Sequence, residues 1–258
     1  MDSKTLRILF IELVGAFGLV FVSAGLVCIN VTTLPEGSTP TSPLSWHQPG
    51  AFGIALGQGL ILAALLALTV PVTGGYLNPA ITLMLWVFTK VETPRAVGLI
   101  VVQLLGGVLA ALALKYTFLD AVLKLAHFGA PQMNPLPYPD VGPRAHLAGA
   151  TIELVLTFFL VFAIFGMVGT GSVGTDPLRL GIVSGMIATA CVLFGFPLTG
   201  AAMNPARWLG PTLFDAFSAD SPRNPWGHSL VYLAGPILGS LLGGYFVFKV
   251  YQTPAEKK

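Results

Sequence analysis

Two copies of the tripeptide Asn-Pro-Ala stand out, because asparagine side chains held in apolar surroundings can donate hydrogen bonds to a passing solute. The copies are Asn78, Pro79 and Ala80 in the first half of the chain, and Asn204, Pro205 and Ala206 in the second. A Thr-Gly pair precedes each copy at the same distance. Asparagine is favoured at a helix N-cap and proline at the first helical position, so each tripeptide predicts a helix start.

Both predicted helices are short. The apolar sequence runs from Asn78 to about Phe88 and from Asn204 to about Phe214. At 1.5 Å per residue, each run covers about 15 Å, or half of a hydrocarbon core. Two half-helices meeting end to end place two partly positive N-termini at mid-depth, where they repel cations. A water molecule held between the two amides points its hydrogens outward, which interrupts proton hopping.

The residues just before each asparagine have no helical pattern. Unpaired backbone cannot face lipid, but it can line an aqueous channel. We therefore expect a row of carbonyl acceptors from Gly74, Gly75, Tyr76, Leu77, Gly200, Ala201, Ala202 and Met203. The glycines in this row permit the backbone angles that such a loop needs.

The composition places these motifs in a membrane. Of the 258 residues, 54% are hydrophobic and only 9% are charged, whereas a soluble domain is about 25% charged. Apolar stretches near 7–30, 50–70, 96–118, 147–169, 178–196 and 228–250 are each long enough to cross a bilayer. We predict an all-α membrane protein with six spanning helices plus the two half-helices, forming a single channel domain over 1–258.

The chain is a duplicated unit. The sequence ELVGAFGLVF at 12–21 matches ELVLTFFLVF at 153–162 in seven of ten positions. We assign the first repeat to 1–126, a proline-rich, non-helical connecting loop to 127–146, and the second repeat to 147–258. Three spans per repeat make the second repeat enter from the opposite side, so the repeats are inverted.

Two intramembrane carboxylates, Glu12 and Glu153, occupy equivalent places in the repeats. Such a group is a functional candidate by default, and a proton relay is one interpretation. Their equivalent placement favours a structural role, in which each accepts hydrogen bonds from the irregular backbone. No metal site or cofactor is expected, because the histidines lack partners at ligand spacing.

Charge sets the expected orientation and excludes some partners. With a cytoplasmic N-terminus, eight of the thirteen Lys and Arg residues lie inside, so both termini are expected in the cytoplasm. The net charge of +2, without a basic run, indicates no nucleic-acid partner. No Gly-x-Ser-x-Gly or His-Glu-x-x-His motif occurs, so an enzyme is not expected. A junction-forming structural protein is the remaining alternative of a different class.

Over nearly its full length, the chain resembles the aquaporin and glycerol-facilitator superfamily. The resemblance rests on the paired motifs, Glu12 and Glu153, and further residues in the third span, after the second motif and in the sixth span, which are Gln103, Gly106, Gly107, Arg207, Gly235 and Pro236. It implies a passive channel in a cell (inner) membrane, with water, small neutral solutes and the lipid bilayer as partners. It also implies a homotetramer with one pore per protomer.

In that family, four positions form a selectivity filter, and counting from the motifs carries them to Gln58, Val192, Ala201 and Arg207. A miscount by one would replace Gln58 with Gly57 or Gly59. The Val and Ala pair resembles plant nodulin-type intrinsic proteins, whereas Trp208 stands where glycerol facilitators have aspartate. We expect conduction of water and small uncharged solutes, with ions and protons excluded. The alternative is a glycerol or metalloid-acid facilitator with low water conductance.

Overall fold

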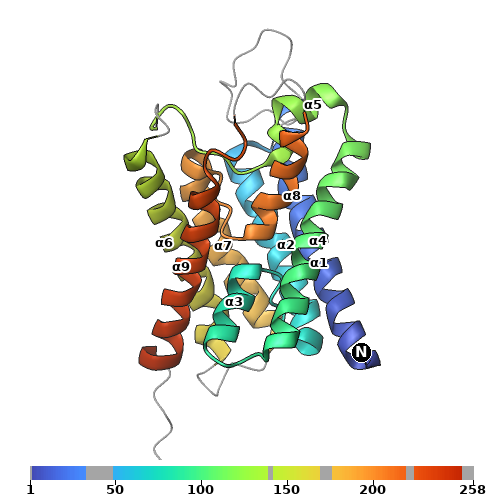
Figure 1. The fold of residues 1–258 in the computed structure, drawn as a ribbon, viewed down its shortest axis with the longest axis vertical. Coiled ribbons are helices and arrows are strands. Elements are labelled where there is room, and N and C mark those ends of the chain that lie inside the picture. The colour runs from blue at the N-terminus through green and yellow to red at the C-terminus, as the bar shows by residue number, and fades with distance from the viewer. Residues whose placement is uncertain (1, 33–48, 139–141, 169–175, 219–223, 252–258) are drawn as a thin grey trace, which may run out of the picture.

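A computed structural model of the chain describes residues 2–32, 49–138, 142–168, 176–218 and 224–251. The described residues form a helical bundle (Figure 1). Its six long helices are α1 (Ser3–Thr32), α2 (Gly50–Thr73), α4 (Thr93–Thr117), α6 (Pro143–Val168), α7 (Pro177–Thr199) and α9 (Ser229–Tyr245), and the last continues into the π-helical turn η2 (Phe246–Tyr251). All six are long and apolar enough to cross a membrane, as the sequence predicted.

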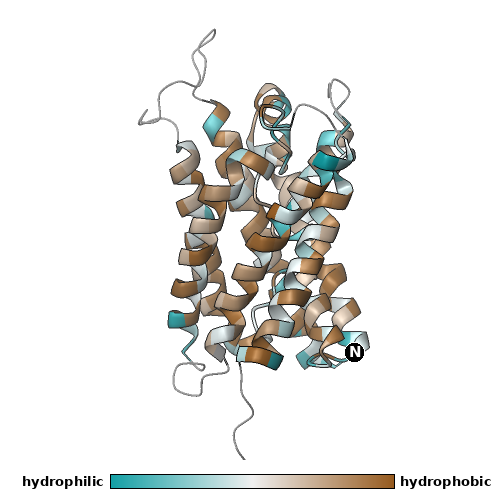
Figure 2. Cartoon of the chain, turned by 90° about the vertical axis from the view of Figure 1, so that its left-hand side faces the viewer, coloured by the Kyte–Doolittle hydropathy of each residue, from teal (hydrophilic) through white to brown (hydrophobic). Residues whose placement is uncertain are grey.

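Hydropathy is distributed as a membrane requires. In Figure 2 the apolar residues cover the middle of the helices, and hydrophilic residues gather near their ends. Large apolar side chains such as Phe10, Leu68 and Leu230 are 66–71% exposed on the outside of the bundle. A soluble monomer rarely exposes apolar surface on this scale. The chain is an integral, multi-pass membrane protein.

Two short helices, α3 (Pro79–Val87) and α8 (Pro205–Ala216), confirm the predicted half-helices. Both begin at the proline of an Asn-Pro-Ala motif. With 9 and 12 residues, they are about 14 and 18 Å long. In Figure 1, α3 occupies the lower half of the bundle and α8 the upper half, so their N-termini approach at mid-height.

Packing between helices follows the inverted repeat. The contacts of α1 with α4 have their counterpart in those of α6 with α9, and α4 packs on α8 as α9 packs on α3. The two repeats join mainly through α2 and α7. Small residues set these crossings: a Cβ added to Gly185 would lie 2.5 Å from the Gly59 carbonyl oxygen, and one added to Gly107 would lie 2.5 Å from that of Ala206.

The connection between the repeats differs from the expected non-helical loop over 127–146. The helix α6 begins at Pro143, because proline is well tolerated in the first turn of a helix. At the other end, the short helix α5 (Asp120–Leu125) leads into the tight turn η1 (His127–Gly129), and neither element was predicted. The extended segment that follows η1 lies beside α8 and α9 in Figure 1.

Candidate solute pathway

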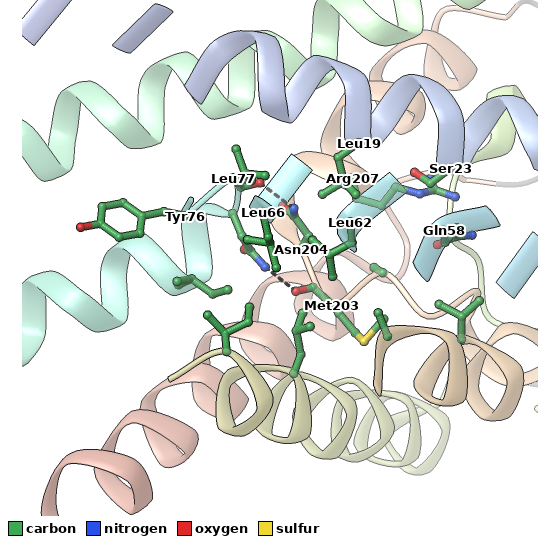
Figure 3. A pocket seen from close by; sticks show the side chains of 17 residues that line it. Leu19, Ser23, Gln58, Leu62, Leu66, Tyr76, Leu77, Met203, Asn204 and Arg207 are labelled. Atoms are coloured by element: carbon green, nitrogen blue, oxygen red, sulfur yellow. Dashed lines mark hydrogen bonds between the residues drawn. The ribbon is translucent and has the colours of Figure 1, made fainter. Parts of the chain in front are cut away.

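A small cavity lies in the centre of the bundle between the two repeats (Figure 3). The cavity volume that the centres of water molecules can occupy is about 50 Å³, which is room for a few waters. The described residues that line it come from α1, α2, α3, α6, α7, α8 and the two loops before the half-helices. They are Leu19, Ser23, Gln58, Leu62, Leu66, Tyr76, Leu77, Asn78, Ile81, Leu160, Ile164, Ala188, Val192, Ala202, Met203, Asn204 and Arg207.

The two asparagines hold the half-helices together across the cavity. Each side-chain oxygen caps its own helix, accepting from the N–H of Ala80 or Ala206 at 2.9 Å. Each side-chain nitrogen donates to the opposite loop: Asn78 to the Met203 carbonyl at 2.8 Å, and Asn204 to the Leu77 carbonyl at 3.0 Å (Figure 3).

This arrangement modifies the sequence-based expectation. The asparagine amides were expected to donate to a water molecule in the pore, but one of the two hydrogens of each amide is used in the cross-link between loops. The second hydrogen of each amide remains. Because Asn78 and Asn204 both line the cavity, it holds two fixed donors at the same depth.

The first loop is organised by Glu12, which is completely buried in α1. Its carboxylate accepts from the Thr73 hydroxyl at 2.5 Å, from the N–H groups of Tyr76 and Leu77 at 3.1 and 2.8 Å, and from the Gln103 amide at 2.8 Å. Since the N–H groups of this loop point toward the glutamate, its carbonyls point away from it. Tyr76 and Leu77 line the cavity on that other side.

Glu153 organises the second loop in the same way. It is also fully buried and accepts from the Thr199 hydroxyl at 2.6 Å and from the N–H groups of Ala202 and Met203 at 3.0 and 2.7 Å. Unlike Glu12, it has no glutamine donor among the described residues. In the second repeat, Tyr232 of α9 donates instead to the Thr199 carbonyl at 2.7 Å.

The backbone of the two loops repeats closely. Leu77 and Met203, directly before the asparagines, have φ of 51° and 50°, and Gly75 and Ala201 have φ of 66° and 47°. Three of these four residues are not glycine, although the left-handed region costs an ordinary residue about 1–2 kcal/mol. The buried glutamates supply the hydrogen bonds that hold this conformation.

Three of the four expected filter residues lie together. Figure 3 shows Gln58 and Arg207 at one end of the cavity, beside Ser23, which the sequence analysis did not single out. Val192 also lines the cavity. Ala201 is buried with its side chain toward Gly195, outside the set of lining residues, and so are the loop glycines Gly74, Gly75 and Gly200.

Gln58 rather than its neighbours faces the cavity. A Cβ on Gly57 would meet Leu26 of α1, and one on Gly59 would meet the α7 backbone. The Gln58 Nε2 and the Arg207 Nε are both buried without a hydrogen-bond partner in the described part of the chain. Because Gln58 and Arg207 both line the cavity, their side chains are the candidate donors at that end.

Comparison with known proteins identifies this architecture. The family described as "Major intrinsic protein" matches residues 1–247. The chain belongs to the major intrinsic protein family, the aquaporins. Membership of this family makes it a membrane channel for water or small solutes, and the family is not a family of enzymes.

Individual aquaporins resemble the chain over most of its length. "Putative aquaporin NIP4-1" of Arabidopsis thaliana is 32% identical, covering 92% of this chain and 72% of the relative. "Aquaporin TIP4-4" of Zea mays is 34% identical, with 94% and 86% covered. The solved aquaglyceroporin of Plasmodium falciparum shares the fold with a TM-score of 0.75, covering 95% of this chain and 96% of that one, at 22% identity.

Proposed function

We propose that the protein is a passive channel that conducts water and small uncharged solutes and excludes ions and protons. The observation that carries this proposal is one narrow cavity with two fixed asparagine donors at mid-depth, a buried arginine at one end and leucine, isoleucine and valine side chains along its walls. A cation would have to lose its water in this space, and the described residues that line the cavity include no carboxylate to offset that loss. Full dehydration costs of order 20 kcal/mol in the idealised limit.

Each group on the pathway has a proposed role. Asn78 and Asn204 orient the water oxygen and break the proton chain, while the carbonyl row accepts hydrogen bonds from the passing molecules. Arg207 and Gln58 donate to the solute at the narrow end, Val192 supplies an apolar surface, and Ala201 contributes through its backbone. We propose that the two glutamates are structural supports, because their carboxylate oxygens already accept three or four hydrogen bonds each.

A facilitator for glycerol or metalloid acids with low water conductance is the second candidate. The observation that favours it is that the cavity lining combines two polar side chains that can donate, Gln58 and Arg207, with the apolar side chain of Val192. A polyol presents hydroxyls on one edge and C–H groups on the other, and this arrangement matches both edges. A water molecule has no C–H groups, so the apolar side chain of Val192 does not favour its passage.

Purified protein in lipid vesicles separates the two candidates. Stopped-flow light scattering should record water flux under an impermeant osmolyte, followed by glycerol, urea and boric acid influx. The variant Ala188→Trp fills the cavity from α7 and should abolish every flux. Leu68→Trp, at a position 71% exposed on the outer surface, is the matched control and should conduct normally. Native vesicles no faster than empty ones for all four molecules would refute the proposal.

The orientation and assembly are also proposals. We propose that both termini are cytoplasmic in a cell (inner) membrane and that four protomers assemble, each with its own pore. The N-terminus and the end of α9 lie at the same end of the bundle, which supports a shared side for the termini (Figure 1). Protease protection of tags in sealed vesicles tests the orientation, and native mass spectrometry tests the tetramer.

A further inference from the structure

The side chain of Arg207, at one end of the cavity, is bonded to a turn in an unusual conformation. The Arg207 Nη1 donates to the Gly129 carbonyl at 2.7 Å, and Gly129 ends the turn η1. All three residues of η1 are left-handed: His127, Phe128 and Gly129 have φ of 50°, 54° and 71°. Two of the three carry side chains, so this conformation costs about 1–3 kcal/mol at each of them. The surrounding contacts must therefore hold the turn in place.

Packing holds the middle and the end of the turn. The Phe128 ring is buried with its centroid 5.9 Å from that of Phe214 on α8. Gly129 lies against the backbone of α1 at Ala24, where there is no space for a Cβ. These contacts fix the turn from two sides, but neither involves its first residue.

The first residue is held by a charged partner. The His127 Nδ1 lies 3.3 Å from both carboxylate oxygens of Asp215, whose side chain is almost completely buried near the end of α8. The one other donor to this carboxylate among the described residues is the Gln132 amide, at 3.5 Å. A buried carboxylate with few partners is costly, so His127 is its main stabilising contact.

The half-helix α8 therefore contacts the segment 127–132 through two side chains. Helix α8 carries Arg207 at its start and Asp215 eight residues later, about 12 Å along the axis. Arg207 holds the Gly129 carbonyl, and Asp215 holds His127. We propose that the His127–Asp215 pair is a specificity-determining positioning element, which fixes Arg207 at the constriction more firmly when His127 is protonated than when it is neutral. This inference rests on the proposed function.

The expected direction follows from the charge on the histidine. Histidine changes its charge between pH 5 and 8, and a protonated ring makes an ion pair with Asp215 in place of a neutral hydrogen bond. When the His127 ring is protonated, the turn holds Arg207 in place at its end of the cavity. When the ring is neutral, the weaker contact with Asp215 lets the guanidinium move. The permeability to larger solutes then rises relative to the permeability to water.

Other titratable and charged groups near η1 come from the elements packed against it. The elements packed against η1 are α1, α4, α5 and α8. Their titratable and charged residues at this end of the bundle are Cys28, Lys115, Asp120, Lys124, Arg207 and Asp215. Histidine is the residue type in η1 and these elements whose free side chain changes charge between pH 5 and 8.

The experiment measures the ratio of glycerol to water permeability in vesicles at pH 5.5 and 8.0. For the native chain we expect the ratio to rise at least threefold toward pH 8.0. His127→Gln, always neutral, should show a high ratio at both values, and His127→Lys, always charged, a low ratio at both. His146→Gln is the matched control, because His146 also lies outside the pathway, bonded to the carbonyls of Gly142 and Gly227, and it should keep the native response.

Opposite effects of the two substitutions distinguish positioning from loss of fold, since damage to the fold would shift both in one direction. Each variant is first checked for a monodisperse elution profile in detergent. A native ratio that does not change with pH, or a His127→Gln variant that follows the native profile, overturns the inference while leaving the channel function intact. A native chain that passes neither water nor solute refutes the proposed function instead.

Discussion

Replacing the two buried glutamates by glutamine should have unequal effects, although they occupy equivalent positions. In Glu153→Gln, the remaining oxygen can serve Thr199 and Ala202, but the new NH₂ group faces the Met203 N–H across a 2.7 Å contact. No acceptor is available to that NH₂ among the described neighbours. Two buried donors are left unpaired, each at a cost of about 1–3 kcal/mol, so the expected loss is about 2–6 kcal/mol.

In Glu12→Gln, a neighbouring amide can adapt. The new NH₂ group faces Gln103, and rotation of the Gln103 amide offers its oxygen in place of its nitrogen. The Thr82 hydroxyl then loses that oxygen but keeps the Asn78 carbonyl at 3.1 Å. Only the Leu77 N–H is left without a partner, so the expected loss is about 1–3 kcal/mol.

The assay is unfolding in mixed micelles with increasing denaturing detergent, followed by the fluorescence of the four tryptophans. We expect the free energy of unfolding to fall by about 1–3 kcal/mol more in Glu153→Gln than in Glu12→Gln. Adding Gln103→Leu to Glu12→Gln should remove the adaptation and bring the two losses close together. A Glu12→Gln variant at least as unstable as Glu153→Gln would show that the hydrogen-bond reasoning is wrong.

Three further predictions concern the constriction and the helix crossings. Arg207→Ala should increase permeability to larger solutes and to protons, because it removes the full charge from the cavity wall; pH-sensitive dye in vesicles measures the leak, and an unchanged leak contradicts the assignment. Val192→His should reduce glycerol flux by a larger factor than water flux, since it adds bulk and a donor; equal losses in stopped flow count against it. Gly185→Ala should destabilise the bundle by about 1–3 kcal/mol, because its Cβ meets the Gly59 carbonyl; an unfolding midpoint equal to native would disprove the tight crossing.

Local signals made much of this fold predictable. Asparagine and proline at a helix start, followed by about ten apolar residues, identify α3 and α8 without reference to the rest of the chain. The six spans follow equally directly from length and apolarity. The start of α6 was missed because proline reads as a helix breaker, although Pro143 stands in the first turn, where its missing N–H costs nothing.

Long-range contacts were not predictable in the same way. The bond from Asn78 to Met203 joins residues 125 apart, and no local pattern distinguishes a free amide hydrogen from a bonded one. His127 and Asp215 are 88 residues apart, and each looks like an ordinary loop or helix-end residue by itself. The close contact between Gly59 and Gly185 also depends on how α2 and α7 cross. Such pairs become visible only when the two repeats are placed face to face.

The exchange of hydrogen bonds between Asn78 and Asn204 has a consequence for biosynthesis. Each loop accepts a hydrogen bond from an asparagine of the other repeat. When the first repeat leaves the ribosome, its Leu77 carbonyl therefore does not yet have the bond from Asn204. At about 5–20 residues per second, Asn204 is made some 6–25 seconds after Asn78. During that interval the loop of the first repeat lacks this hydrogen bond, and it is completed only after the second repeat has been made.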